Sequence, residues 1–390
     1  SPVVKKLSRG SHLTQENPFL TNVFPGAEPN LISVGSNGRM MLYVRQNPTL
    51  PILQSTEIAW SYYDGTVWNA PQIILSDTRA EMSPVAGVDE NGKVVAAWLR
   101  IKDTAFSGTV STFDELPEFY KKLEVVSSVF DPLSQTWGPI TQLTDDLALD
   151  TSLRLSSDNT GKLLLTWQSN PSGEFTADAA NPASLKYTFW NGTSWNPLAN
   201  VATGLINVNE HASAIDGNNG FIILPQDPDL NVVDDRVLLV YVWNGSSWSS
   251  SAIYAAGGVD NLLPSAVYDA TGEGQVIWLR GSDLVQGTLS NPQPETVRAG
   301  SNSMAFFSLQ LMNNTAGNMT FVWQEVSDQG AANIFAAIYD AASQTWSEDL
   351  RLNVDEWQAS DSSGYYGTDG KLQLAYLATQ INSETRTVTN

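Results

Sequence analysis

Short apolar runs recur along the chain at intervals that average about 55 residues, and each run ends in an aromatic residue or in leucine. The seven runs are Met40–Tyr43, Val94–Trp98, Leu163–Trp167, Phe221–Leu224, Gln275–Trp278, Met319–Trp323 and Leu372–Tyr376. The first and last anchors, Tyr43 and Tyr376, lie 333 residues apart across six intervals, so seven repeats of 55.5 residues account for all 390 residues. Continuous apolar runs of this length are typical of strands buried on both faces. The pattern therefore predicts seven copies of one small β unit.

The second repeat shows the predicted unit most clearly. Strands are expected at Ser83–Val88, Val94–Trp98 and Val125–Phe130, and a fourth strand begins at Trp137. Asp-Gly and Asn-Gly pairs between the runs supply the positive φ that tight hairpins need. A period of this size built from short strands indicates a β-propeller with four-stranded blades.

We therefore predict an all-β fold, a single seven-bladed β-propeller of four-stranded blades. The predicted blades cover about 17–79, 80–146, 147–205, 206–258, 259–300, 301–355, and 356–390 together with 1–16. The last repeat is short after its second strand. We expect the N-terminal segment to pair in that blade and close the ring, which removes exposed strand edges.

Most of the tryptophans occupy two positions of the repeat. Second strands end in Trp98, Trp167, Trp278 and Trp323, and fourth strands open with Trp68, Trp137, Trp195, Trp248 and Trp346. Such regular placement favours packing between blades over scattered ligand contacts.

Charge and composition narrow the classes of partner. The 41 acidic and 20 basic residues give a net charge of −21, which repels nucleic-acid backbones and anionic lipid headgroups. There is no apolar stretch long enough for membrane insertion and no cysteine, which excludes disulfides and cysteine-bound zinc. This composition predicts a secreted or cell-surface protein of bacteria or archaea. We also expect a monomeric domain, either on its own or as a piece of a longer chain.

A first set of candidate site residues comes just before the first strands. These are acidic residues ten to twelve positions ahead of the glycine of their own hairpin turn: Glu28, Glu81, Asp150, Glu210 and Asp260. In a propeller, the loops that enter first strands share a face with those that leave second strands, so these carboxylates are expected around one mouth of the central channel. They suit solvated loop positions, a calcium ion with oxygen ligands, or an acid/base pair.

A second set follows the second-strand anchors by one or two residues: Arg45, Arg100, Arg280, Gln168 and Gln324. Arginine and glutamine beside carboxylates suit a carbohydrate or carboxylate ligand, because the guanidinium group makes bidentate contacts. The alternative is that these arginines and the carboxylates neutralise one another between blades.

Other catalytic and metal signals are sparse. His211 is the histidine best placed to act as a base, and with Arg100 and Glu210 it forms the catalytic set expected of an enzyme. Asp227, Asp229 and Asp234 weakly resemble a calcium loop, although the glycine and final glutamate of an EF-hand are missing. Beyond a possible calcium ion, no cofactor is expected.

The turns Ser61–Trp68 and Asn191–Trp195 resemble the Asp-box of sialidase-like propellers, which lies between third and fourth strands. The whole repeat is also similar to exported bacterial and archaeal seven-bladed propellers used for adhesion or glycan binding. A sialidase would imply an arginine triad, a tyrosine–glutamate pair and an Arg-Ile-Pro motif, and that motif is absent from this sequence.

From these observations we expect an extracellular, non-catalytic binding or adhesion propeller. Its partner would be a polysaccharide or a cell-surface protein, recognised on the face that bears the first-strand carboxylates. The first alternative is a polysaccharide-active enzyme, a lyase or glycosidase, with an acid/base at the channel mouth. The second is a structural module of a larger surface protein.

Overall fold

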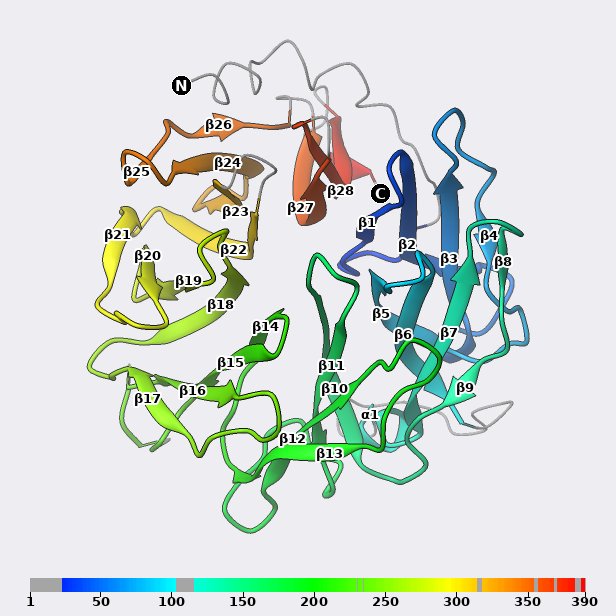
Figure 1. Cartoon of the computed structure of the whole chain (residues 1–390), viewed down its shortest axis with the longest axis horizontal. Helices are drawn as coiled ribbons and strands as arrows, with labels where there is room; N and C mark the ends of the chain where they lie inside the picture. The colour runs from blue at the N-terminus through cyan, green and yellow to red at the C-terminus, as the bar shows by residue number, and fades with distance from the viewer. Residues whose placement is uncertain are drawn as a thin grey trace.

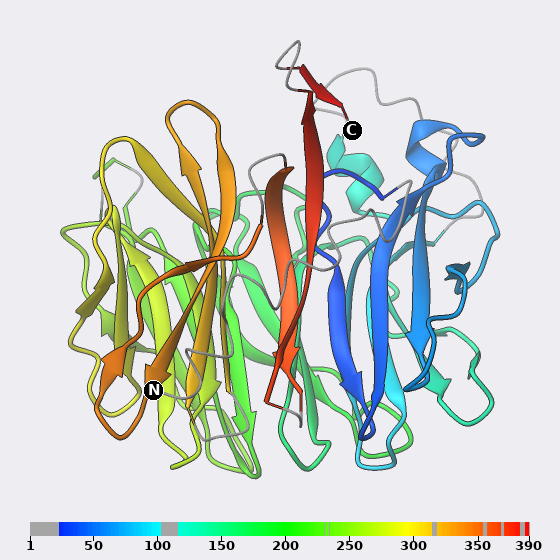
Figure 2. The same ribbon diagram turned by 90° about the horizontal axis from the view of Figure 1, so that it is seen from above.

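The computed structural model describes residues 23–102, 116–229, 231–233, 235–313, 318–353, 357–367, 370–382 and 387–389. Its strands form antiparallel sheets arranged in a ring (Figure 1), and the strands run between the same two faces of that ring (Figure 2). The predicted all-β propeller is confirmed. None of the helices in the described residues is long and apolar enough to cross a membrane.

Six sheets are full blades, whose strands follow one another outward from the centre of the ring (Figure 1). The first three are β1 (Asn30–Val34), β2 (Gly38–Gln46), β3 (Thr56–Tyr63) and β4 (Gln72–Ile73); β5 (Glu81–Val88), β6 (Val94–Ile101), β7 (Leu123–Asp131), β8 (Thr136–Trp137) and β9 (Thr141–Gln142); β10 (Leu149–Ser157), β11 (Leu163–Asn170), β12 (Ala183–Phe189) and β13 (Ala199–Leu205). The next three are β14 (Ala212–Asp216), β15 (Asn219–Gln226), β16 (Val237–Trp243) and β17 (Ala252–Ala255); β18 (Asn261–Tyr268), β19 (Gly274–Arg280), β20 (Asp283–Thr288) and β21 (Glu295–Arg298); β22 (Met304–Asn313), β23 (Met319–Ser327), β24 (Ala332–Asp340), β25 (Thr345–Trp346) and β26 (Leu350–Arg351). Two short helices, η3 (Ile52–Gln54) and α1 (Leu116–Tyr120), lie in connections.

The predicted number of blades is wrong, because the ring has six full blades and not seven. The remaining sheet has three strands, β27 (Trp357–Tyr366), β28 (Leu372–Asn382) and β29 (Thr387–Thr389), and no fourth described strand pairs with it. The last apolar run does form a second strand, β28. Such a run marks only the inner hairpin of a unit, so counting runs does not count four-stranded blades. The expected closure by residues 1–16 lies outside the described residues.

The first strands of neighbouring sheets contact one another and form the inner wall of the ring. Hydrogen bonds join them: Asn30 donates its side-chain amide to the Pro84 carbonyl oxygen at 2.6 Å, linking β1 to β5. Between β27 and β1, the backbone N–H of Leu31 donates to the Ser363 hydroxyl at 3.2 Å. The three-stranded sheet therefore fills the gap between the sixth blade and the first.

The main apolar cores lie between adjacent sheets. Leu42 of β2, Trp60 of β3 and Trp98 of β6 belong to one buried cluster that joins the first two blades. The second-strand tryptophans Trp98, Trp167, Trp278 and Trp323 are at most 1% exposed, as their regular spacing predicts. Burying such large rings supplies much of the packing energy between blades.

The turns between third and fourth strands are built as predicted. In the turn at Asp64, one carboxylate oxygen accepts hydrogen bonds from the backbone N–H groups of Thr66 and Val67. Asn191 holds its own turn in the same way through its amide oxygen. Asp and Asn therefore recur at this position because both provide the acceptor that closes the loop.

Candidate functional site

The two predicted sets of residues do lie on one face of the ring. Strand pairing places Glu81 opposite Arg100, Asp150 opposite Ser169, and Asn261 opposite Arg280. The starts of first strands and the ends of second strands are therefore neighbours, and we call this side the entry face.

A bulge recurs near the start of five first strands. In each case one residue other than glycine has a φ of 48° to 56°, and strand pairing shifts beside it: Ser83, Ser152, Leu263, Ser308 and Asp361. A left-handed conformation costs such residues roughly 1–2 kcal/mol. Bulges redirect side chains and occur often beside functional sites. Here they lie at the entry face, along the inner wall.

Four charged side chains at or near the first strands of four sheets influence one another electrostatically. Glu28, just before β1, feels the charges of Arg154 in β10, Glu210 before β14 and Asp361 in β27. Arg154 donates to a carboxylate oxygen of Glu210 at 2.8 Å and to the backbone carbonyl oxygen of His211 at 3.2 Å. Since β5 lies between β1 and β10 along the inner wall, Glu28 and Arg154 come from sheets that are not neighbours. We call Glu28, Arg154, Glu210 and Asp361 the central charge cluster.

Glu28 of the central charge cluster carries a perturbed carboxyl group. Its side chain is exposed at the surface, and desolvation by the neighbouring protein raises the pKa of this carboxyl group to about 7. Arg154 opposes this shift, whereas the negative charges of Asp361 and Glu210 add to it. Glu210 is 64% exposed and paired with a guanidinium group, so the cluster offers one carboxyl able to hold a proton near neutral pH and one exposed carboxylate.

A cleft of about 480 Å³ opens beside Glu210 on the entry face. It lies between the fourth, fifth and sixth blades, and most of its lining is apolar: Leu262, Leu263, Leu279, Met304, Phe306 and Phe307. Phe307 is 45% exposed. The cleft therefore combines apolar walls with a carboxylate at its edge, which is typical of a small-molecule site.

Glu81 and Arg100, two predicted site residues, are buried against each other. Glu81 accepts hydrogen bonds from the Arg100 guanidinium at 3.0 Å, from the Trp98 indole at 3.1 Å and from the backbone N–H of Ile58 at 3.1 Å. Arg100 also pairs with Asp77. Burial raises the pKa of Glu81 to about 7 against the opposing effect of these donors. These contacts join the first blade to the second, and the Arg100 guanidinium is paired with Glu81 and Asp77.

Asp150 is fully buried and belongs to a different group of carboxylates. Burial raises its pKa to about 7, and the nearby Ser169 and Thr144 hydroxyls and the Lys186 ammonium oppose the shift. Oxygen atoms of Glu124, Asp146 and Asp150 lie within 4.8 Å of one another. The sequence reading missed Glu124 and Asp146, which follow no repeated spacing.

Asp260 and Arg280 both form hydrogen bonds with other residues of the protein. Asp260 accepts hydrogen bonds from the backbone N–H and the guanidinium group of Arg236, at 3.3 and 3.1 Å. Arg280 donates to the side-chain oxygen of Asn261 at 3.0 Å and to the backbone carbonyl of Ala256 at 3.3 Å.

The glutamines and Arg45 lie at junctions between elements. Gln168 donates to the carbonyl oxygen of Asn209 at 2.6 Å, and Gln324 donates to that of Ala359 at 3.1 Å, so each links its blade to the next sheet. Arg45 of β2 forms a backbone bridge with Val23. Gln168 and Gln324 therefore serve junctions between sheets, whereas the Nε of Arg45 is buried without a hydrogen-bond partner among the described residues.

His211 is placed inside the protein. It is 1% exposed, its Nε2 lies 2.7 Å from the Thr166 hydroxyl, and burial together with Arg154 lowers its pKa to about 3. The imidazole is therefore neutral and has no access to a ligand at the entry face.

The acidic loop predicted as a weak calcium site is organised by its own turns. Asp227 accepts the backbone N–H of Asp229 at 3.1 Å and lies 3.5 Å from the Arg236 guanidinium. Asp229 accepts the backbone N–H and side-chain amide of Asn231, both at 3.0 Å. Asp234 lies outside the described residues.

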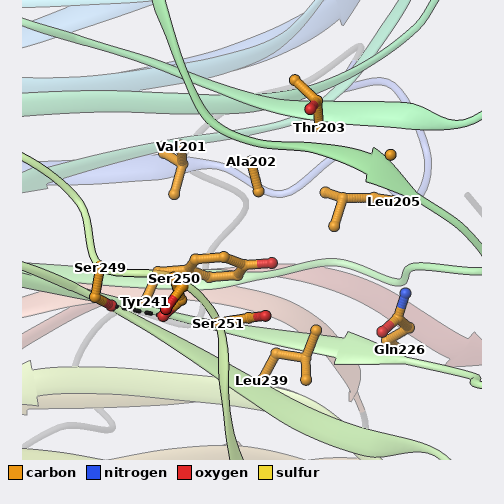
Figure 3. Close-up of a pocket in the computed structure, with 11 residues that line it drawn as sticks. Val201, Ala202, Thr203, Leu205, Gln226, Leu239, Tyr241, Ser249, Ser250 and Ser251 are labelled. Carbon is orange, nitrogen blue, oxygen red and sulfur yellow. Dashed lines mark hydrogen bonds between the residues drawn. The ribbon is translucent and has the colours of Figure 1, made fainter.

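A second cavity of about 410 Å³ lies between β13 and the outer strands of the fourth blade. Figure 3 shows its lining, which includes the ring of Tyr241, Gln226 and the serines Ser249, Ser250 and Ser251. No carboxylate, histidine, lysine or arginine lines it. Of the two cavities, the cleft beside Glu210 is therefore the one with a group for acid/base chemistry.

Comparisons with known proteins show the fold. No family model and no curated protein matches the chain. Similar solved structures include the Hadza microbial sialidase Hz136 (15% identity, TM-score 0.50, covering 87% of this chain and 60% of that one), the Trypanosoma rangeli sialidase (13%, 0.51, 93% and 53%) and a Dyadobacter fermentans protein of unknown function (11%, 0.52, 80% and 93%). The chain thus spans 53–60% of the length of these two sialidases.

These neighbours correct the functional expectation. The similar propellers include sialidases, which are glycosidases. The polysaccharide-active enzyme, our first alternative, agrees with them better than the non-catalytic binding or adhesion propeller. That main expectation is therefore wrong. The likeness to sialidase-like propellers expected from the turn motifs holds at the level of the fold.

Proposed function

We propose that this protein is a glycosidase whose active site lies at the centre of the entry face, between Glu28 and Glu210. The observation that carries the proposal is the central charge cluster, in which one carboxyl has a pKa of about 7 and another carboxylate is exposed and paired with Arg154. Carboxyl groups held in two different protonation states are the usual acid and base of glycoside hydrolysis.

Each residue then has a role. Protonated Glu28 donates its proton to the glycosidic oxygen as the bond to the anomeric carbon breaks. Glu210 acts on the other side of the sugar, either by removing a proton from the attacking water or by attacking the anomeric carbon itself. Arg154 holds the Glu210 carboxylate in place at 2.8 Å. Overall, water adds across the bond and Glu28 regains a proton.

The cleft beside Glu210 supports a sugar as the substrate. Its volume of about 480 Å³ suits a small saccharide, and the exposed ring of Phe307 offers a flat apolar surface for the C–H face of a sugar. A lyase fits less well, because elimination beside a carboxylate-bearing sugar calls for cationic groups, and the cluster holds three carboxylates against one guanidinium.

The same charge balance favours a neutral glycan. The Arg100 guanidinium donates to Glu81 and that of Arg280 donates to Asn261, so neither is available for a substrate carboxylate. In this proposal the substrate differs from that of the sialidases that share the fold. Secretion or surface display and a monomeric state stay predictions.

The pH dependence of hydrolysis tests the acid. Hydrolysis of a panel of 4-methylumbelliferyl glycosides should be highest below pH 7 and fall as Glu28 loses its proton above its pKa of about 7. Glu28→Gln should lower kcat/KM by about 100-fold or more. The exposed Glu174 provides the control, since Glu174→Gln makes the same chemical change outside the site. Unchanged activity of Glu28→Gln would remove Glu28 from the mechanism.

Arg154 tests the pairing with Glu210. Arg154→Met removes the guanidinium that holds the Glu210 carboxylate, and we expect kcat to fall at least tenfold. Circular dichroism of the folded variant separates this loss from unfolding. Equal kcat values in the variant and the wild type would show that the ion pair has no part in catalysis.

A further inference from the structure

Three carboxylates gather between the second and third blades, away from the central charge cluster. Glu124 lies in β7, Asp146 in the connection between β9 and β10, and Asp150 in β10. Their oxygen atoms lie within 4.8 Å of one another. Three like charges this close repel strongly unless something between them compensates.

Asp150 is the unusual member of this group. Its side chain is fully buried, and neither carboxylate oxygen accepts a hydrogen bond of normal length and angle from the described residues, although the hydroxyl groups of Ser169 and Thr144 lie nearby. Leaving a buried carboxylate without partners is costly, so native proteins rarely do it without a ligand.

Glu81 shows what the same position looks like when it is satisfied. Like Asp150 in the third blade, it lies two residues before the bulge of its first strand, and three donors bind its carboxylate. The unsatisfied lone pairs of Asp150 therefore distinguish it from Glu81 at the equivalent position.

The other two carboxylates are already oriented. Glu124 accepts the Thr144 hydroxyl at 2.7 Å and the backbone N–H of Asp146 at 3.1 Å. Asp146 accepts the backbone N–H of Ala148 at 2.9 Å, and its other oxygen lies 3.6 Å from the Lys186 ammonium. Each carboxylate keeps lone pairs beyond these contacts. Such hydrogen bonds fix metal-binding carboxylates in place.

We propose that Glu124, Asp146 and Asp150 bind one calcium ion between the second and third blades. All three donors are oxygens, which calcium prefers, and it binds oxygen at about 2.3–2.6 Å. Two oxygens on opposite sides of one such ion lie about 5 Å apart, so a group within 4.8 Å needs little movement to bind it. Magnesium needs about 2.1 Å and stricter octahedral geometry. The Asp146 side chain, 44% exposed, provides the way in from solvent.

The calcium ion would act as a clamp. Glu124 belongs to the third strand of the second blade, whereas Asp150 lies in the innermost strand of the third. An ion bound by both ties the two blades together on the entry face. This site stands apart from the proposed glycosidase activity and does not depend on it.

Thermal unfolding of the full chain tests the site. After dialysis against EGTA, the wild-type Tm should rise by about 3 °C when free calcium reaches 100 times its Kd. The rise should vanish in Asp150→Asn, which keeps the size of the side chain and removes its charge. It should persist in Glu81→Gln and in Asp229→Asn, which remove carboxylates from the equivalent position and from the acidic loop.

A second variant covers the case in which Asp150→Asn does not fold. Asp146→Asn changes a partly exposed ligand and should weaken calcium binding at least tenfold by titration calorimetry. No rise in the wild-type Tm up to 10 mM calcium, or the same rise in Asp150→Asn, would overturn the proposal. An equal response to magnesium would overturn the assignment to calcium.

Discussion

The buried histidine makes the stability of this protein sensitive to mild acid. His211 is 1% exposed, and its folded-state pKa of about 3 lies below the value of 6.5 for a solvated imidazole. The unfolded chain therefore takes up a proton at His211 below pH 6.5, whereas the folded chain stays neutral until about pH 3. Stability from this residue is fully present above pH 6.5 and is lost as the pH falls from 6.5 toward 3.

The size of the effect follows from the two pKa values. At pH 5, about 1.5 units below the unfolded-state pKa of 6.5, protonation of His211 stabilises the unfolded state by about 2 kcal/mol. With an unfolding entropy near 2.1 cal/mol/K per residue, a chain of 390 residues loses about 2.5 °C in Tm for that amount. The carboxyls Glu28 and Glu81 act in the opposite direction, because desolvation raises their pKa values.

A variant isolates the histidine from these carboxyls. His211→Asn has no titrating group at this position, so its Tm should fall by about 2.5 °C less than that of the wild type between pH 7.5 and pH 5. Scanning calorimetry at the two pH values measures both differences. Equal decreases in the two proteins would refute the argument that His211 is buried in its neutral form.

Two further predictions compare matched positions. Gly161 has a φ of +86°, and an added Cβ would lie 2.2 Å from a backbone nitrogen of the neighbouring blade, whereas the corresponding Gly92 has a φ of +75° and open space. Gly161→Ala should therefore cost at least ~2 kcal/mol more than Gly92→Ala in urea unfolding, and equal costs would contradict the close approach. Trp98 donates its indole N–H to Glu81, whereas that of Trp167 has no hydrogen-bond partner among the described residues, and both rings are fully buried. Trp98→Phe should cost about 1–3 kcal/mol more than Trp167→Phe, and the reverse order would contradict that hydrogen bond.

The inner part of the fold was open to prediction because its signals are local. An apolar run such as Val94–Trp98 identifies a second strand, and an Asp-Gly or Asn-Gly pair identifies the hairpin that precedes or follows it. The outer strands carry weaker signals: β8 (Thr136–Trp137) has two residues, and β29 (Thr387–Thr389) has three. The error in blade number follows from this difference, since in the described part of the chain the last inner hairpin has one short strand beyond it.

The candidate site was partly visible for the same reason. Glu28 and Glu210 precede their turns by a constant interval, and the structure places both at the centre of the entry face. Arg154 and Asp361 were missed because bulges set the course of their strands, and the left-handed residues there are serine, leucine or aspartate, which do not mark such a conformation. His211 directly follows Glu210, just before β14, but its side chain is buried in the protein.

Release of new reducing ends from neutral oligosaccharides is the most direct measure of the central claim. At pH 6 the wild type should cleave at least one neutral glycan, Glu28→Gln and Glu210→Gln should each lose about 100-fold or more of that activity, and a sialylated oligosaccharide should be a poorer substrate. Glu174→Gln should match the wild type. If no neutral glycan is cleaved, or if both site variants keep wild-type rates, the central charge cluster is not a glycosidase site.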